Sequence, residues 1–87
     1  MLIETQKIGE SLRFNRKLLA CLVHINEEKV TFKTTLACGR QEVRQGGLGE
    51  LITLADKIKL RVIQIDEACV NATLLIVEPK NMVVCRV

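Results

Sequence analysis

The sequence aligns with itself when residue 8 is placed on residue 48 and the following residues are kept in step. Between residues 8–37 and 48–77, six of thirty positions are identical, and ten of the others pair one apolar residue with another. The identities include Gly9-Glu10 with Gly49-Glu50, and the alignment needs no gap. Two β-rich segments can align by chance, but the matched turns favour two tandem copies of one small unit. A unit of this size, about 40 residues, is close to the lower limit for an independent core. We therefore expect a single domain, with copy one at residues 1–41 and copy two at residues 42–87.

Apolar residues recur at every second position through most of the chain, which is typical of β-strands. The turn-forming segments 26–28 and 66–68 each separate two such runs, so each copy should contain a central hairpin. The alternation changes phase at Val62-Ile63, which predicts a β-bulge. The segment 48–58 is the most helix-like, but its alignment with 9–18 favours a strand and a turn. The sequence thus predicts an all-β sandwich or barrel with no long helix.

Composition narrows the possible functions. The 87 residues carry a net charge of +3 and contain two Phe but no Trp or Tyr, so aromatic platforms for stacking bases are absent. With one histidine and no nucleophile–base or phosphate-loop pattern, we expect neither an enzyme nor a cofactor. No two cysteines form the C-x₂-C pair that is typical of a zinc site, so we expect no metal. No segment approaches the length of a membrane span, and the first residues lack the basic and apolar pattern of a signal peptide, so we expect neither. We expect a cytoplasmic protein whose cysteines are small apolar strand residues. These are Cys21, Cys38, Cys69 and Cys85.

The opening Met-Leu-Ile-x-Thr-x-Lys-Ile-Gly-Glu-Ser-Leu, at residues 1–12, is similar to the opening of the carbon storage regulator (CsrA/RsmA) family. Residues 18–34 fit the central hairpin of that family, and the second copy fits again from Gly49-Glu50 through Val77. The end of the chain, from Pro79 to Arg86, resembles the family's last strand. The two copies together cover nearly the whole sequence. The resemblance implies a single-chain, interleaved pseudodimer of two five-stranded units, and we expect it to be monomeric.

Members of the family bind messenger RNA leaders at unpaired GGA motifs and control translation or transcript stability. Their RNA-binding surface joins the first strand of one subunit to the last strand of the other. Here those strands correspond to 2–8 and 82–87, and an exposed strand pair offers backbone groups and an arginine fork to unpaired bases. The resemblance thus implies one RNA-binding surface at this junction, with Arg44 serving a second, eroded surface. The implied contact residues are Thr5, Gln6, Lys7, Arg44, Val84 and Arg86.

Several positions depart from the family pattern. Glu4 and Gln6 stand where the family has Leu and Arg, and Gly46-Gly47 stand where the second copy would need a basic pair. The segment 37–48 is too short to hold both the last strand of copy one and the first strand of copy two. The first hypothesis is therefore an RNA-binding regulator with weakened or altered binding. The alternatives are a degenerate protein-interaction module or antagonist that no longer binds RNA, and an unrelated small β protein.

Overall fold

The computed structural model describes residues 2–68, 70–78 and 83–87. Within them the fold is all-β, and one turn of 3-10 helix, η1 (Ala55–Lys57), is the only helical element, as the alternating pattern predicts. None of the described helical residues forms a segment that could cross a membrane. The strands are β1 (Leu2–Lys7), β2 (Ser11–Phe14), β3 (Leu18–Ile25), β4 (Lys29–Leu36), β5 (Gln41–Gly47), β6 (Leu51–Thr53), β7 (Lys59–Asp66), β8 (Asn71–Glu78) and β9 (Val84–Arg86).

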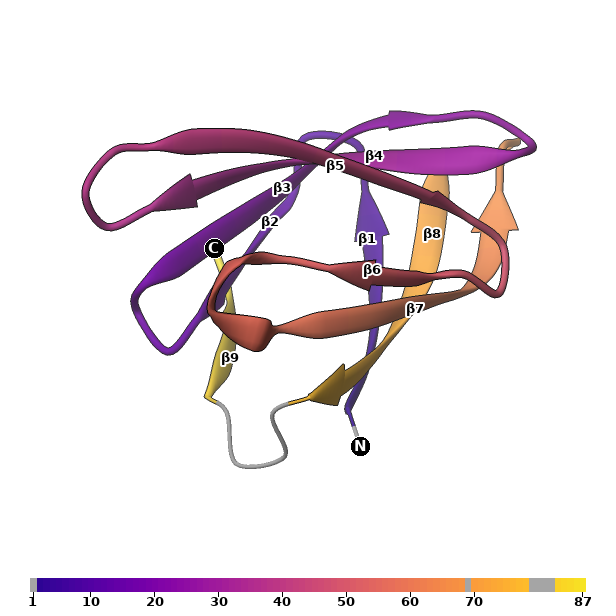
Figure 1. The fold of residues 1–87 in the computed structure, drawn as a ribbon. Helices are drawn as coiled ribbons and strands as arrows, with labels where there is room; N and C mark the ends of the chain where they lie inside the picture. The colour runs from indigo at the N-terminus through magenta and orange to yellow at the C-terminus, as the bar shows by residue number, and fades with distance from the viewer. Residues whose placement is uncertain (1, 69, 79–82) are drawn as a thin grey trace.

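The strands form two antiparallel sheets that enclose one core (Figure 1). The first sheet has the order β1-β8-β7-β6, and the second has the order β5-β4-β3-β2-β9. Both aromatic residues of the chain, Phe14 and Phe32, lie in the core at 1% exposure or less, and aliphatic side chains from both sheets surround them. The first and last strands belong to different sheets, so the chain interleaves between the two layers.

The two sheets share their strand order. The run β5-β4-β3-β2 in the second sheet corresponds to the run β1-β8-β7-β6 in the first. The turn before β2 and the turn before β6 also make the same hydrogen bonds. Glu10 Oε1 accepts from the Lys7 N–H at 2.7 Å, and Glu50 Oε1 accepts from the Gly47 N–H at 2.9 Å. The bulge expected at Val62-Ile63 is present, since the register shifts between Val62 and Gln64, and it has a counterpart between Leu22 and His24.

The expectation of a gapless repeat is wrong for the second half of each hairpin. In the first hairpin Ile25 pairs with Val30, whereas in the second Ile65 pairs with Ala72. Val30 therefore corresponds in structure to Ala72, and the turn of the second hairpin is two residues longer than that of the first. The match of Val30 with Val70 was accidental, because Val70 lies in the turn with a φ of 56°.

A single strand, β5, occupies the segment that is too short for two. It forms the edge of the second sheet against β4 and also passes beside β6 in the first sheet. A Cβ built on Gly46 would lie 2.6 Å from Ile52 Cγ1 on β6, which shows that the Ile52 side chain packs directly against the backbone of β5. Glycine at 46 thus leaves the space that the Ile52 side chain occupies. The expected copy boundary, between residues 41 and 42, falls inside β5.

The cysteines match their expected role only in part. Cys21 lies in β3 and is half-buried, but Cys38 and Cys85 are exposed, and Cys38 lies in the turn after β4 rather than in a strand. Cys69 is outside the described residues, as are residues 79–82, where the sequence predicts a loop and the start of the last strand. The thiols at 38 and 85 therefore do not contribute to the core.

Candidate nucleic-acid interface at the β1/β9 seam

The first and last strands of the chain approach each other at the open edge between the two sheets, where Arg86 of β9 contacts Glu4 and Thr5 of β1. β1 is the edge strand of the first sheet, and β9 is the edge strand of the second. We call the line between them the β1/β9 seam and define it by Glu4, Thr5 and Gln6 on β1 with Val84 and Arg86 on β9. Edge strands leave a row of backbone N–H and C=O groups without strand partners. The seam therefore combines free backbone groups with side chains from the two ends of the chain.

Strand register determines which side chains point into the seam. Residues opposite each other in an antiparallel pair project to the same face of a sheet. Glu4 lies opposite Leu74 of β8. Leu74 belongs to the buried core, so Glu4 is on the inner face of the first sheet. Arg86 lies opposite Leu12, another core residue. Glu4 and Arg86 therefore extend from the inner faces of the two sheets and meet across the gap.

The contact between them is an ion pair. Arg86 Nη2 lies 2.9 Å from Glu4 Oε2, and Arg86 Nε donates to the same oxygen at 3.0 Å. Arg86 Nη2 also donates to the Thr5 carbonyl oxygen at 3.4 Å. The side chain of Glu4 is 16% exposed, while that of Arg86 is 61% exposed. The arginine is thus held against β1 but remains accessible from solvent.

The expected contact residues of β1 divide between its two faces. Thr5 and Lys7 are exposed on the outer face, and Thr5 Oγ1 lies 3.1 Å from Thr73 Oγ1 on β8. Gln6 points inward and is only 2% exposed, so its amide is out of reach of a ligand on the surface. On β9, Val84 is half-buried and packs against the core. The structure therefore brings Arg86 against Glu4 and the Thr5 carbonyl, leaves the side chains of Thr5 and Lys7 exposed on the outer face, and buries Gln6.

Arg44 lies elsewhere. It is on β5, at the opposite edge of the second sheet from β9, so four strand spacings of about 4.8 Å separate it from the seam by roughly 19 Å. Its Nη2 pairs with Glu42 Oε2 at 2.9 Å on the same strand. Arg44 therefore cannot contribute to the site at Arg86.

In the sequence, Glu4 is notable only as a departure from the family pattern on the first strand. The structure shows that it is also the partner of Arg86. The signal was available, since the resemblance already put the two strands together and the two residues carry opposite charges. The described residues contain no cluster of three or more histidine, cysteine, aspartate or glutamate side chains that could hold a metal ion.

Comparison with models of protein families, with curated proteins and with solved structures finds no match to this chain in any of the three. The geometry of the seam is therefore the basis for any functional conclusion.

The buried amide of Gln6 gives a first testable prediction. Its Oε1 is buried without a hydrogen-bond partner among the described residues, and its Nε2 donates only a long 3.4 Å bond to the Thr5 carbonyl. A buried acceptor without a partner is destabilising. Gln6→Leu is therefore expected to raise the free energy of unfolding by about 1 kcal/mol in urea denaturation. Gln45→Leu, at an exposed position of β5, is the control and should change it by less than about 0.5 kcal/mol. A loss of stability in Gln6→Leu would show that the amide has a partner.

Proposed function

We propose that this protein is a cytoplasmic, monomeric RNA-binding regulator of the carbon storage regulator type, built as a tandem pseudodimer. It would bind unpaired GGA-containing segments of messenger RNA and control translation or transcript stability. The observation that carries the proposal is the contact of Arg86 on β9 with Glu4 and the Thr5 carbonyl on β1. The proposed surface needs the first and last strands to be neighbours, and these residues are at opposite ends of the sequence.

The chemistry of the seam suits an unpaired base or a phosphate. An arginine fork can donate two parallel hydrogen bonds to guanine or to phosphate oxygens. The open edge of β1 offers backbone groups to base edges, which is useful in a chain without aromatic side chains for stacking. Lys7 is exposed on the same strand and adds a positive charge. Thr5, Lys7 and Arg86 are therefore the proposed contacts at the surface, with Val84 packing β9 against the core.

Glu4 lowers the RNA affinity expected of the seam but does not prevent binding. An ion pair that is largely exposed on one side contributes about 0–1 kcal/mol, because water and salt screen it. A charged contact to a base or phosphate contributes about 1–3 kcal/mol. Release of Arg86 from Glu4 thus costs less than the new contact provides. The carboxylate left behind still repels phosphate, so we propose reduced affinity rather than no binding.

The test is a fluorescence-anisotropy titration of a GGA-containing RNA hairpin at two salt concentrations. Arg86→Ala is expected to weaken binding by about 1–3 kcal/mol, which corresponds to a loss of roughly 5- to 150-fold. The matched control is Lys29→Ala, which removes one exposed positive charge from β4, a strand that does not contribute to the seam. Lys29→Ala should reduce RNA affinity only slightly, because it lowers the net positive charge of the protein by one without removing a direct contact. Equal losses in the two variants would place the RNA elsewhere.

A second candidate is a protein-interaction module or antagonist that has lost RNA binding. The observation that favours it is a row on the outer face of the first sheet in which three apolar side chains accompany Arg61. Ile3 lies opposite Leu75, and both Leu75 and Leu51 lie opposite Arg61. Ile3 is 59% exposed and Leu51 is 43% exposed. If the wild-type protein fails to bind GGA RNA even at low salt, the RNA proposal is wrong and this candidate replaces it.

A further inference from the structure

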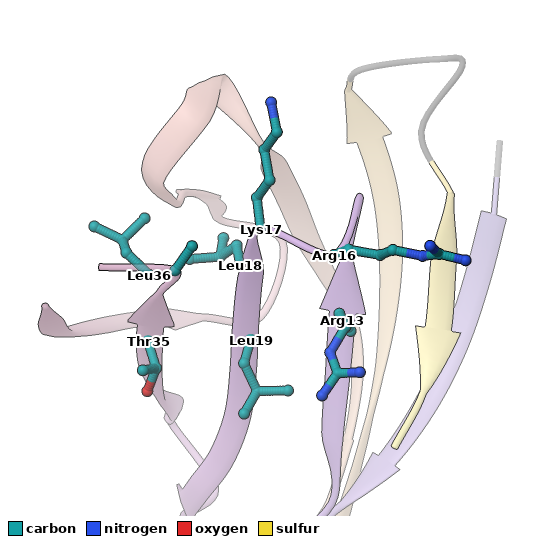
Figure 2. A pocket seen from close by; sticks show the side chains of 8 residues that line it. Arg13, Arg16, Lys17, Leu18, Leu19, Thr35 and Leu36 are labelled. Carbon is teal, nitrogen blue, oxygen red and sulfur yellow. The ribbon is translucent and has the colours of Figure 1, made fainter. Parts of the chain in front are cut away.

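A pocket outside the seam lies at the end of the second sheet, around the turn between β2 and β3 (Figure 2). Its volume is about 170 Å³. Pockets for whole small molecules usually exceed about 300 Å³, so this one has room for a single compact group. It is lined by Arg13, Arg16, Lys17, Leu18, Leu19, Thr35, Leu36 and Ala37.

The pocket is strongly positive. Three of its eight lining residues are Arg13, Arg16 and Lys17, and none is acidic. Within the described part of the chain, these three side chains make no ion pair. Their head groups diverge in Figure 2, where Arg16 extends over β9 and Lys17 points away from it. Like charges without a counter-ion repel each other, and a bound anion would relieve that repulsion.

The apolar lining strengthens the effect of these charges. Register places Arg13 opposite Leu19 on β3, and Leu19 opposite Thr35 on β4, so the three form one row across the outer face. The leucines at the pocket exclude water from one side of a bound anion and lower the local dielectric constant. Electrostatic attraction grows as the dielectric constant falls. Thr35, two strands away from Arg13, adds a polar residue to the lining.

The backbone at Arg16 gives an independent indication of function. Asn15 and Arg16 form the centre of the turn with φ values of 50° and 60°. Asparagine tolerates this left-handed region, but the second position of such a turn strongly favours glycine, and arginine is strained there. The turn is also fixed in place, because the Asn15 N–H donates to the Val83 carbonyl at 2.8 Å and Asn15 Oδ1 accepts from the Val83 N–H at 3.0 Å. Arg16 thus occupies a position where arginine destabilises the turn. Residues with strained backbones of this kind are common at binding sites.

We propose that this pocket binds a phosphate group and that the head groups of Arg13, Arg16 and Lys17, which diverge in Figure 2, turn toward the phosphate when it binds. Two guanidinium groups and one ammonium group match the two negative charges and several acceptor oxygens of a phosphate ester better than they match a single carboxylate. Because the pocket holds only the phosphate, the remainder of the ligand lies on the surface. The phosphate belongs either to a free nucleotide or to the backbone of a single-stranded nucleic acid. The proposal does not require RNA binding at the seam.

Arg16→Gly is the most informative variant, because it removes the charge and also relieves the strained backbone. We expect it to weaken phosphate binding by about tenfold while the melting temperature stays the same or rises. Arg13→Gln should weaken binding to a similar extent without changing the turn. Lys29→Ala is the charge-matched control. It lies on the same strand as Thr35 but six residues away, about 20 Å at 3.3 Å per residue.

Binding is followed by NMR titration of the backbone amides of Leu19, Thr35 and Ala37 with three probes. The probes are inorganic phosphate, adenosine monophosphate and a ten-nucleotide single strand that lacks GGA. Saturable shifts that are lost in Arg16→Gly and Arg13→Gln but retained in Lys29→Ala support the site. If the monophosphate binds as tightly as the oligonucleotide, the source is a free nucleotide, whereas tighter and salt-sensitive oligonucleotide binding indicates a nucleic-acid backbone.

The proposal is overturned if none of the three probes gives saturable shifts at low salt, or if Arg16→Gly and Lys29→Ala behave alike. The same titrations in Arg86→Ala separate this site from the seam. Loss of GGA RNA binding with unchanged phosphate binding shows two sites. Phosphate binding in a protein that does not bind GGA RNA at all would leave this proposal standing and reject the function proposed for the seam.

Discussion

Phe14→Ala is expected to lower the free energy of unfolding by about 3–5 kcal/mol. The Phe14 side chain has an exposure of 0%, and its strand is paired on both sides, with Leu18 of β3 opposite it on one side and Val84 of β9 on the other. Removal of the ring leaves a cavity that neighbouring side chains fill only in part. A domain of 87 residues has a total stability of roughly 4–13 kcal/mol, so the change removes a large part of it.

The measurement is urea denaturation, with Phe14→Leu as the control. Leucine already holds the equivalent position of the second copy, where Leu54 is 3% exposed. Phe14→Leu should therefore cost less than about 1.5 kcal/mol. Hydrogen exchange of the β9 amides should be faster in Phe14→Ala than in Phe14→Leu, since β9 has β2 as its only strand partner in the described structure. Similar stabilities for the two variants would show that the ring is not part of the core.

The sequence predicted the all-β fold, both hairpins and the bulge, because alternation of apolar residues is a direct consequence of strand geometry. It predicted the seam only through the family resemblance, since no local pattern connects residue 4 with residue 86. It did not show which way Gln6 points. Thr5, Gln6 and Lys7 are all polar, so the alternation that distinguishes the inner face from the outer face disappears in β1.

Two other features could not be predicted for different reasons. The two-residue insertion in the second hairpin was concealed by the accidental match of Val30 with Val70, and strand register was needed to detect it. The basic pocket has Arg13, Arg16 and Lys17 close together in the sequence, but Thr35 and its neighbours reach it from β4. Only the pairing of β3 with β4 brings that part of the lining to the three cations.

Gly46→Ala is expected to lower the free energy of unfolding by about 1–3 kcal/mol, a large effect for one methyl group. A Cβ at this position would lie 2.6 Å from Ile52 Cγ1 and 3.0 Å from Ile52 Cδ1. Ile52 is 3% exposed and surrounded by the core, so it cannot move aside freely. Gln45→Ala, at the exposed neighbouring position, is the control and should have little effect on the same urea denaturation curve.

A double-mutant cycle identifies the cause of the loss. Ile52→Ala removes the atoms that a new Cβ would meet, so Gly46→Ala should cost clearly less in that background than in the wild type. If Gly46→Ala lowers the free energy of unfolding equally in the two backgrounds, the loss comes from the backbone at position 46 and not from the contact with Ile52. Gly46 is the counterpart of Gln6 in the repeat, and β5 borders β4 while passing beside β6. The Ile52 side chain leaves no space for a side chain at 46, so this position cannot hold the basic residue that the family pattern would need in the second copy.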